Sequence, residues 1–307
     1  LGKVSIFIEA FNILPNDEKI QELFSLALTN EPFYLDIIER LVEVLNKEPH
    51  FSQEQIQPIC EKLLERGLLK ECKKLLEYAD FNFDDDIAQK GFSGLLSATR
   101  YFDRYQNPRY KEGWYEDLLD FKEISKTEPN EDHLAQIFSY LISRGNITDQ
   151  ITTIQDDYKK TIDEPFVQKV FIALLRDNSV SLVKKLSEET KIIPNIDNET
   201  LRKIVDTMIQ EKSEFSHYGS NAAKILDPIK DALGLEYLPV SKNIADAFYE
   251  HIFSKGGRHL VSGVSSFFRL TNIRPNYADE QVDQIYHDYD DRAWTSVNVA
   301  LDKKPSN

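Results

Sequence analysis

The sequence of 307 residues predicts an all-α protein, an α-solenoid of about eight stacked antiparallel helical hairpins. Apolar residues recur at offsets 0, 3, 4, 7 and 8, which lie on one face of an α-helix. The segments with this pattern begin 32 to 46 residues apart, the range of helical-hairpin repeats with two insertions. Short Gly or Asn breaks follow several of them, and each break precedes a second helix-compatible segment. One hairpin cannot bury the apolar stripes of both its helices, so neighbouring hairpins must stack.

The first helix of the repeat is clearest in three segments near the middle of the chain. The segments 133–142, 166–175 and 200–209 read HLAQIFSYLI, FVQKVFIALL and TLRKIVDTMI, and their first core residues are 33 and 34 positions apart. Each segment has an apolar residue at all five offsets, so the same helical face is apolar three times. Five further first helices are predicted, with first core residues Ile20, Ile56, Ala88, Ile244 and Val282.

A shorter second helix is predicted after a backbone reversal in three of the repeats. The reversals contain Gly67, Gly145 and Asn178, and Gly and Asn tolerate the left-handed backbone that a tight reversal uses. Helix starts are marked too: Asp163 is a capping residue type, and Pro165 suits the first turn of a helix. The second helices are predicted at 68–79, 148–160 and 180–189.

Two stretches depart from the repeat. The stretch 97–130 is too long for one partner helix, and we expect an aromatic-rich insertion there, a long helix broken at Asn107-Pro108. The stretch 210–243 contains two Gly and two Pro, and we expect it to hinge two subdomains. The whole chain, 1–307, is expected to be one helical repeat domain. Its subdivisions would be N-terminal repeats (1–96), the aromatic-rich insertion (97–130), central repeats (131–212), and C-terminal repeats with a cap (213–307).

The amino-acid composition limits the kinds of partner and environment that are expected for this protein. The longest apolar runs fall well short of the roughly 20 residues of a membrane helix, so no membrane insertion is expected. The net charge is −15, from 52 acidic and 37 basic residues. Such a balance repels a nucleic-acid backbone at long range unless basic residues gather on one face. The only cysteines, Cys60 and Cys72, lack the spacing of metal ligands and are predicted to be small buried apolar residues.

Two segments resemble part of a known repeat family. The segments 63–86 and 174–197 each contain a Gly or Asn turn, an amphipathic helix and a loop that ends near Asp, and they resemble the second half of a pentatricopeptide repeat. Tetratricopeptide repeats have similar length, but this chain lacks their regular ladder of small residues. The pentatricopeptide-like resemblance covers about half the chain, 52–90 and 131–212. It implies an organellar protein, in the mitochondrial matrix, that binds single-stranded RNA or serves as a helical part of gene-expression machinery.

The residues at the base-reading positions differ from those of that family. RNA-reading members place Asn, Ser or Thr one position after the first core residue, where the side chain contacts a base. None of these three residue types stands at the matching positions here. This departure, with the acidic charge, favours a scaffold of the same geometry that holds proteins. The matching positions are Gln21, Gln57, Gln89, Ala135, Gln168, Arg202, Ala245 and Asp283.

Two groups of residues are candidate partner contacts. The stretch 255–274 contains four basic residues and no Asp or Glu, which makes it the candidate contact for RNA or an acidic partner. Aromatic residues in the insertion and in the tail are the candidate protein interface, although the tail with Trp294 also suits the terminal cap of a solenoid. The first group is Lys255, Arg258, Phe267, Arg269 and Arg274, and the second is Tyr105, Trp114, Tyr115 and Trp294.

We expect no functional motif for catalysis, cofactor binding or metal binding. Asp80, Asn82 and Asp84 have the spacing of a calcium loop, but Gly at the sixth place and Glu at the twelfth are missing. A solvated loop between helices is the simpler interpretation. The sequence has no HExxH motif, no nucleophile elbow and no phosphate-loop spacing. We therefore expect a protein that is not an enzyme.

Three functions remain open from the sequence. The leading hypothesis is a non-catalytic scaffold or adaptor that binds other proteins of a multi-subunit assembly, in mitochondrial gene expression or associated with the ribosome. The second is a single-stranded RNA-binding protein of pentatricopeptide type that uses the basic stretch 255–274. The third is a cytoplasmic co-chaperone or trafficking adaptor of tetratricopeptide or HEAT type.

Overall fold

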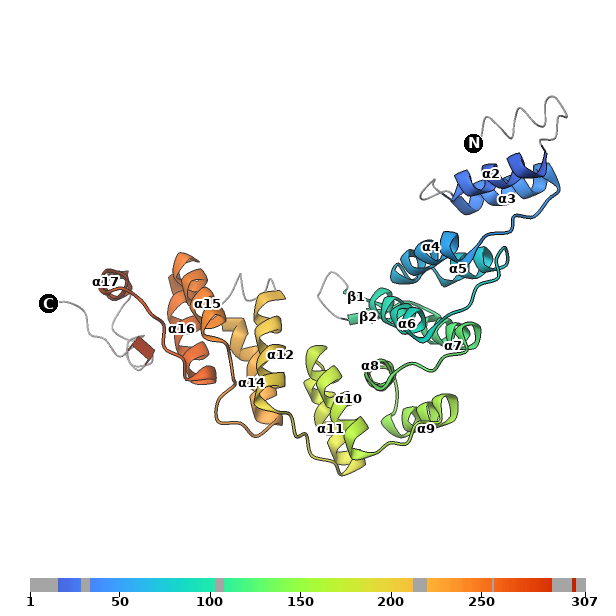
Figure 1. Cartoon of the computed structure of the whole chain (residues 1–307). Helices are drawn as coiled ribbons and strands as arrows, with labels where there is room; N and C mark the ends of the chain where they lie inside the picture. Colours follow the sequence, from blue (N-terminus) through green and yellow to red (C-terminus); the bar gives the residue numbers. More distant parts are fainter. Residues whose placement is uncertain are drawn as a thin grey trace. The chain divides into compact units, whose positions relative to one another are not determined.

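The secondary-structure elements of the described part of the chain are almost all α-helices. The computed structural model describes residues 16–28, 34–102, 108–211, 220–255, 257–288 and 300–301. These residues belong to two compact units, Leu1–Ile137 and Phe138–Asn307, and the border falls within helix α8 (Glu131–Ile142). Figure 1 shows paired helices in both units. The predicted all-α class is therefore confirmed, and each unit is described by itself.

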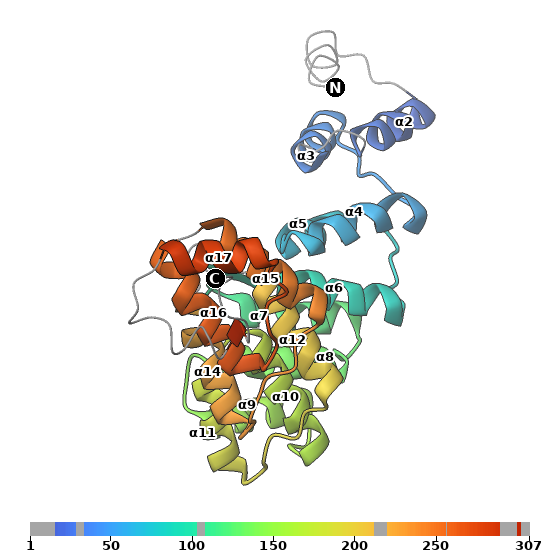
Figure 2. The ribbon, with the colours of Figure 1, turned by 90° about the vertical axis from the view of Figure 1, so that its left-hand side faces the viewer.

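The first unit stacks three helical hairpins. The two helices of each hairpin contact each other, and so do the first helices α4 and α6 and the second helices α3 and α5. The hairpins follow one another in chain order in both views (Figures 1 and 2). Successive repeats thus pack in two layers, as predicted. The helices are α2 (Asp17–Ala27), α3 (Tyr34–Leu45), α4 (Gln53–Glu65), α5 (Leu69–Leu76), α6 (Asp85–Thr99) and α7 (Trp114–Ser125).

The second unit also stacks its helices in two layers. One layer contains α10, α12 and α15, and each helix contacts the next. The other layer contains α9, α11, α14 and α16, again with contacts between successive helices. The helices are α9 (Ile147–Tyr158), α10 (Glu164–Arg176), α11 (Val180–Thr190), α12 (Asn198–Glu211), α14 (Ser220–Ala232), α15 (Lys242–Lys255), α16 (Gly257–Thr271) and α17 (Asp279–Asp288).

Local sequence signals explain where these helices begin and turn. The Asp163 side chain accepts a hydrogen bond from the Phe166 N–H at 3.0 Å, and a proline lies in the first turn of α10. The turns after α4 and α10 contain Gly67 and Asn178 with φ of +69° and +55°. Both are left-handed conformations that Gly and Asn adopt at low cost. The eight predicted first helices and the three predicted second helices are all present.

The insertion differs from its prediction. Instead of a long helix broken at Asn107-Pro108, α6 ends at Thr99 and is followed by two short antiparallel strands, β1 (Arg100–Phe102) and β2 (Pro108–Tyr110). The tyrosines and phenylalanine of this segment favour strands, and Pro108 takes the first position of β2, where proline is tolerated. The stretch 210–243 lies within the second unit and contributes α14.

Helices α4 and α6 approach unusually closely. A Cβ atom on Gly94 would lie 2.7 Å from Glu65 Cα and 2.8 Å from Leu64 O, so only glycine fits. One turn earlier, a Cβ atom on Gly91 would lie 2.3 Å from the ring of Phe121. Gly94 thus lets α6 pack directly against the backbone of α4, and Gly91 makes room on α6 for the Phe121 ring of α7.

Candidate functional site

Two glutamine side chains hold the linkers between repeats. Gln89 on α6 donates from Nε2 to the carbonyl oxygen of Glu128 at 2.8 Å and accepts at Oε1 from the Asn130 N–H at 2.9 Å. Gln168 on α10 donates to the carbonyl oxygen of Ile193 at 2.8 Å and accepts from the Asn195 N–H at 2.8 Å. In each case one amide bridges a carbonyl and the N–H two residues further on. We call these side chains the glutamine clamps.

Other first helices hold the next linker with different side chains. Asp206 on α12 accepts from the Ser241 N–H at 2.9 Å, just before α15 begins. Tyr249 on α15 donates its hydroxyl to the carbonyl oxygen of Ile273 at 2.6 Å, before α17 begins. A polar residue of the first helix thus fixes the chain that leads to the next first helix.

The glutamine clamps occupy two of the eight positions that match base-reading positions. In an RNA reader such side chains must be aimed at base edges. Here Gln89 and Gln168 use both the donor and the acceptor of their amides on protein backbone. These hydrogen bonds hold both amides against the linker backbone, and turning an amide toward a base would cost the linker those bonds.

Replacing Gln168 by alanine should lower the free energy of unfolding by about 1 to 2 kcal/mol, because two backbone groups of the linker lose their partners. Urea unfolding followed by far-ultraviolet circular dichroism measures this change. The matched control is Gln210→Ala, at an exposed position of α12, with an expected change below about 0.5 kcal/mol. Equal effects of the two substitutions would show that the clamp contributes nothing to stability.

The basic stretch 255–274 does not form one basic face among the described residues. The ring of Phe267 has 0% exposure and is stacked on Phe248 with centroids 4.1 Å apart, so its prediction as a contact residue is corrected: it is a core residue. Arg269 pairs with Asp227 on α14 at 2.7 Å. The guanidinium of Arg274 lies 5.8 Å from the centroid of the Phe268 ring. The side chains of Lys255 and Arg258 lie outside the described part.

The aromatic candidates of the insertion also include a core residue. Trp114, at the start of α7, is 2% exposed and contacts the half-buried ring of Tyr115 edge to face. Its indole packs inside the first unit, which corrects its prediction as an interface residue. Tyr105 and Trp294 lie outside the described residues. Of the four predicted aromatic contacts, only Tyr115 is therefore described and partly exposed.

The contacts of Lys111 hold the base of the hairpin formed by the short strands β1 and β2. The Lys111 N–H donates to the Thr99 carbonyl at 2.8 Å, which continues the strand pairing by one step. The Lys111 ammonium donates to the carbonyl oxygen of Gly67 at 2.9 Å, in the turn between α4 and α5, and lies 3.4 Å from Asp117. The contact between Lys111 and Gly67 joins residues 44 positions apart, so sequence periodicity gave no sign of it.

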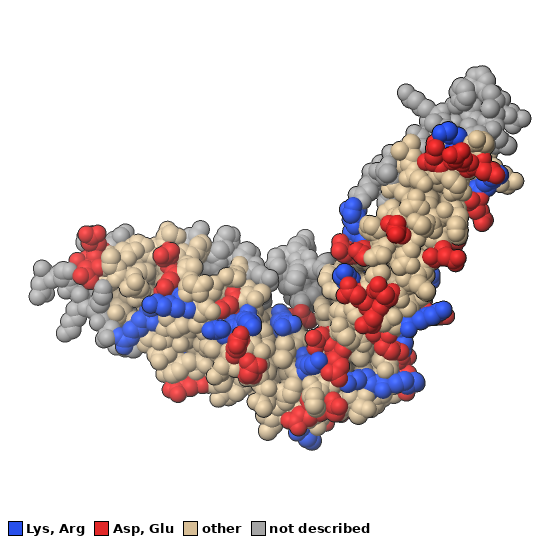
Figure 3. Space-filling view, viewed as in Figure 1, with Lys and Arg blue, Asp and Glu red and all other residues tan. Residues whose placement is uncertain are grey.

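Charge is distributed unequally between the units. The first unit contains 27 Asp and Glu against 16 Lys and Arg, a net charge of −11, and the second contains 25 against 21, a net charge of −4. In Figure 3 acidic side chains gather over the helices of the first unit. The net charge of the first unit should therefore repel a nucleic-acid backbone at long range.

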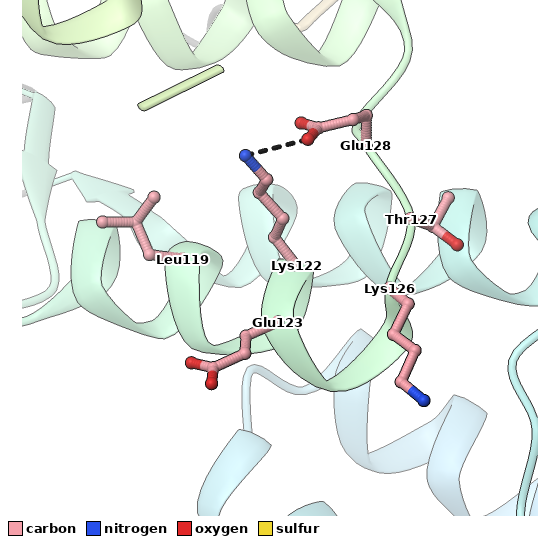
Figure 4. A pocket seen from close by; sticks show the side chains of 6 residues that line it. All are labelled: Leu119, Lys122, Glu123, Lys126, Thr127 and Glu128. Carbon is pink, nitrogen blue, oxygen red and sulfur yellow. Dashed lines mark ion pairs between the residues drawn. The ribbon is translucent and has the colours of Figure 1, made fainter. Parts of the chain in front are cut away.

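A depression at the C-terminal end of α7 has no catalytic arrangement. It is lined by Leu119, Lys122, Glu123, Lys126, Thr127 and Glu128. Figure 4 shows these side chains splayed apart, with one ion pair of 2.9 Å between Lys122 and Glu128. The Thr127 hydroxyl donates to the Ser125 carbonyl. The groups stabilise the end of α7 and the following linker.

The residues at 80–84, which have the spacing of a calcium loop, stabilise the start of the helix that follows. The Asp84 carboxylate accepts from the Ile87 N–H at 2.8 Å and caps α6, and the Asn82 carbonyl accepts from the Gln53 side chain at 3.2 Å. Over the residues that the structure describes, no group of three or more His, Cys, Asp or Glu side chains could hold a metal ion. The solvated-loop interpretation fits these contacts.

His133 is a titratable side chain that is partly buried in the first unit. Burial lowers the pKa of its imidazole from the usual 6.5, and the charge of Asp132 opposes this only in part. The ring nitrogen Nδ1 lies 3.0 Å from Gln89 Oε1, and the ring lies near Phe92. The neutral form is thus preferred in the fold, and protonation favours the unfolded chain.

The free energy of unfolding should therefore fall as the pH drops through about 6.5, the unfolded value, towards the lower folded pKa, and His133 should add no pH dependence above that range. The measurement is urea unfolding at a series of pH values between about 7.5 and 5.5. In the His133→Asn variant, whose amide can still donate to Gln89, the decline should be smaller. Identical declines in both proteins would contradict this role of His133.

None of the helices in the described ranges is long and apolar enough to cross a membrane. No family model, curated protein or solved structure matches the chain. The assignment of the fold therefore depends on the stacked hairpins themselves.

Proposed function

We propose that the chain is a non-catalytic helical-repeat scaffold that holds other proteins within a larger assembly. The observation that carries this proposal is the stacking of helical hairpins in two layers, found in each unit. Stacked hairpins present extended surfaces to which every repeat contributes a few exposed residues. Such surfaces suit protein partners, because affinity builds from many small contacts around a few central side chains.

Three observations favour proteins over RNA as the partner. The glutamine clamps use their amides on backbone, at positions where an RNA reader would present a base-contacting group. The first unit has a net charge of −11, which repels phosphates. In the basic stretch of the second unit, the aromatic ring of Phe267 belongs to the core and Arg269 is paired with Asp227.

We propose the hairpin of β1 and β2 as a contact of the first unit with a partner. Its six paired positions contain two arginines, two tyrosines and no carboxylate, within a strongly acidic unit. The strand register places Arg100 opposite Tyr110 and Tyr101 opposite Arg109. Arginine and tyrosine are enriched among the residues that dominate binding at protein interfaces. The anchored base described above would hold this hairpin at a fixed place on the unit.

The complete protein, expressed with a purification tag at its natural level, should be recovered with a defined set of proteins. The double substitution Arg100→Glu and Arg109→Glu should lower recovery of at least one of them about tenfold or more. The matched control, Lys184→Glu with Lys185→Glu at exposed positions of α11, makes the same change of charge in the second unit and should leave that recovery unchanged. Recovery of the protein without any stoichiometric partner would contradict the proposal.

We infer mitochondrial gene expression as the setting from the resemblance to pentatricopeptide repeats. The test is the location of the product of the complete gene, followed by fluorescence and by protease protection of purified organelles. A matrix protein should remain protected until both mitochondrial membranes are opened. A protein that is found in the cytosol would support a cytoplasmic adaptor instead.

A further inference from the structure

The two cysteines of the chain contact each other inside one helical hairpin. Cys60 lies on α4 and Cys72 on α5, six residues before and six residues after Arg66 in the turn. The Cys72 thiol interacts with the Cys60 thiol and raises its pKa, and both residues are 0% exposed and free. From sequence, each had been predicted as a separate buried apolar residue. The fold instead brings them together as a pair.

The turn between the helices fixes this contact. The Gly67 N–H donates to the Leu64 carbonyl at 2.9 Å, and the Leu68 N–H donates to the Leu63 carbonyl at 2.8 Å, which closes the end of α4. The left-handed Gly67 reverses the chain, and its carbonyl accepts from the Lys111 ammonium. Because α4 and α5 contact each other and Cys60 and Cys72 are equally far from the turn, the reversal lets their two buried side chains meet.

Burial keeps both sulfurs away from solvent in the closed fold. Buried residues of the same two helices are apolar, among them Ile56, Leu63 and Leu75. The hydrogen bond to Cys72 and burial both raise the pKa of the Cys60 thiol, so little thiolate forms at neutral pH. An oxidant can therefore react only when the hairpin opens locally.

We propose that Cys60 and Cys72 are a redox pair that closes a disulfide between α4 and α5 when the protein is exposed to hydrogen peroxide. In the first step one sulfur attacks a peroxide oxygen, the O–O bond breaks, and a sulfenic acid and one water are formed. In the second step the other thiol attacks that sulfur, the S–S bond forms, the S–O bond breaks, and a second water leaves. Two thiols are oxidised and one hydrogen peroxide is reduced to two waters.

The disulfide would lock the second hairpin of the first unit. It closes a short loop within one hairpin, and this constraint lowers the entropy of the unfolded chain. The same hairpin packs against α6 through its first helix and against α3 through its second. Oxidation should therefore raise the thermal midpoint of the first unit while it leaves the helix content unchanged.

The intact chain, treated with excess hydrogen peroxide and then unfolded in N-ethylmaleimide, should lose the mass of two hydrogen atoms and take up no maleimide. Peptide mapping should find Cys60 joined to Cys72, and dithiothreitol should restore two reactive thiols and the original thermal midpoint. The Cys72→Ala variant should form no disulfide and should gain oxygen on Cys60. Alanine is the control because it fills a buried position without a second thiol.

Three results would overturn the proposal. One is a wild-type protein that gains oxygen atoms on either sulfur without losing the two hydrogens. Another is a disulfide that joins two chains rather than two helices of one chain. The third is a wild-type protein whose thiols both remain open to N-ethylmaleimide after peroxide treatment in mild urea, where the hairpin opens but the chain keeps its helices. The last measurement uses the wild-type chain alone, so it holds even if the variant fails to fold.

Discussion

Replacing Gly94 by alanine is expected to lower the free energy of unfolding of the first unit by about 3 kcal/mol. The added Cβ atom would stand 2.7 Å from Glu65 Cα, 2.8 Å from Glu65 N and 2.8 Å from Leu64 O. All three are backbone atoms of α4, so no side chain can rotate away and the two helices must move apart. That movement would disturb the contact between the first helices of adjacent hairpins.

Urea unfolding followed by circular dichroism measures the loss. The matched control is Ser93→Ala on the same helix, where the side chain is exposed and the change should stay below about 0.5 kcal/mol. Alanine has a higher helix propensity than glycine, so a change that depended on propensity alone would stabilise the variant. A Gly94→Ala protein as stable as the wild type would show that α4 and α6 do not approach as described.

Replacing Phe267 by alanine should lower the free energy of unfolding of the second unit by about 4 kcal/mol. The ring is fully buried, stacked on Phe248 and in edge contact with Tyr249 at 5.3 Å between centroids. Removing it leaves a cavity that the surrounding helices cannot fill completely. The loss should be one of stability, seen in thermal or urea unfolding, rather than a loss of a partner with the fold intact.

The comparison for Phe267→Ala is Arg269→Ala, two positions further along the same stretch. Its ion pair with Asp227 is largely exposed, and such pairs contribute below about 1 kcal/mol. A Phe267→Ala protein that unfolds like the wild type but has lost a partner would show that Phe267 is a surface contact residue. A large loss of stability from Arg269→Ala would show that the ion pair is worth more than exposure suggests.

The helical periodicity of the sequence predicted most of the fold. Every first helix lies where apolar offsets predicted it, because burial of one face is what makes each helix form. The same helical spacing was also present at Phe267 and Trp114, the two core residues that were predicted as surface contacts. Leu260, Val264 and Phe267 repeat at helical spacing along α16, and Trp114 begins such a stripe with Leu118 and Phe121 along α7. Their size and neighbouring charges suggested interfaces, whereas their spacing indicated the core.

The remaining features required the three-dimensional structure. The glutamine clamps join residues 25 to 41 positions apart, and a single polar residue on a helix has no pattern that indicates its partner. The hairpin of β1 and β2 is too short for periodicity to distinguish it from a broken helix. The pairing of Cys60 with Cys72 depends on the reversal at Gly67, which sequence located without fixing which side chains would meet.

The mass of the particle that contains the complete protein, measured in a native extract before and after nuclease treatment, tests the proposed scaffold most directly. A scaffold for proteins should migrate in a particle much larger than its own chain, with fixed protein stoichiometry, and nuclease should leave that particle intact. A lone monomer in the untreated extract, or a particle that nuclease reduces to the monomer, would contradict it.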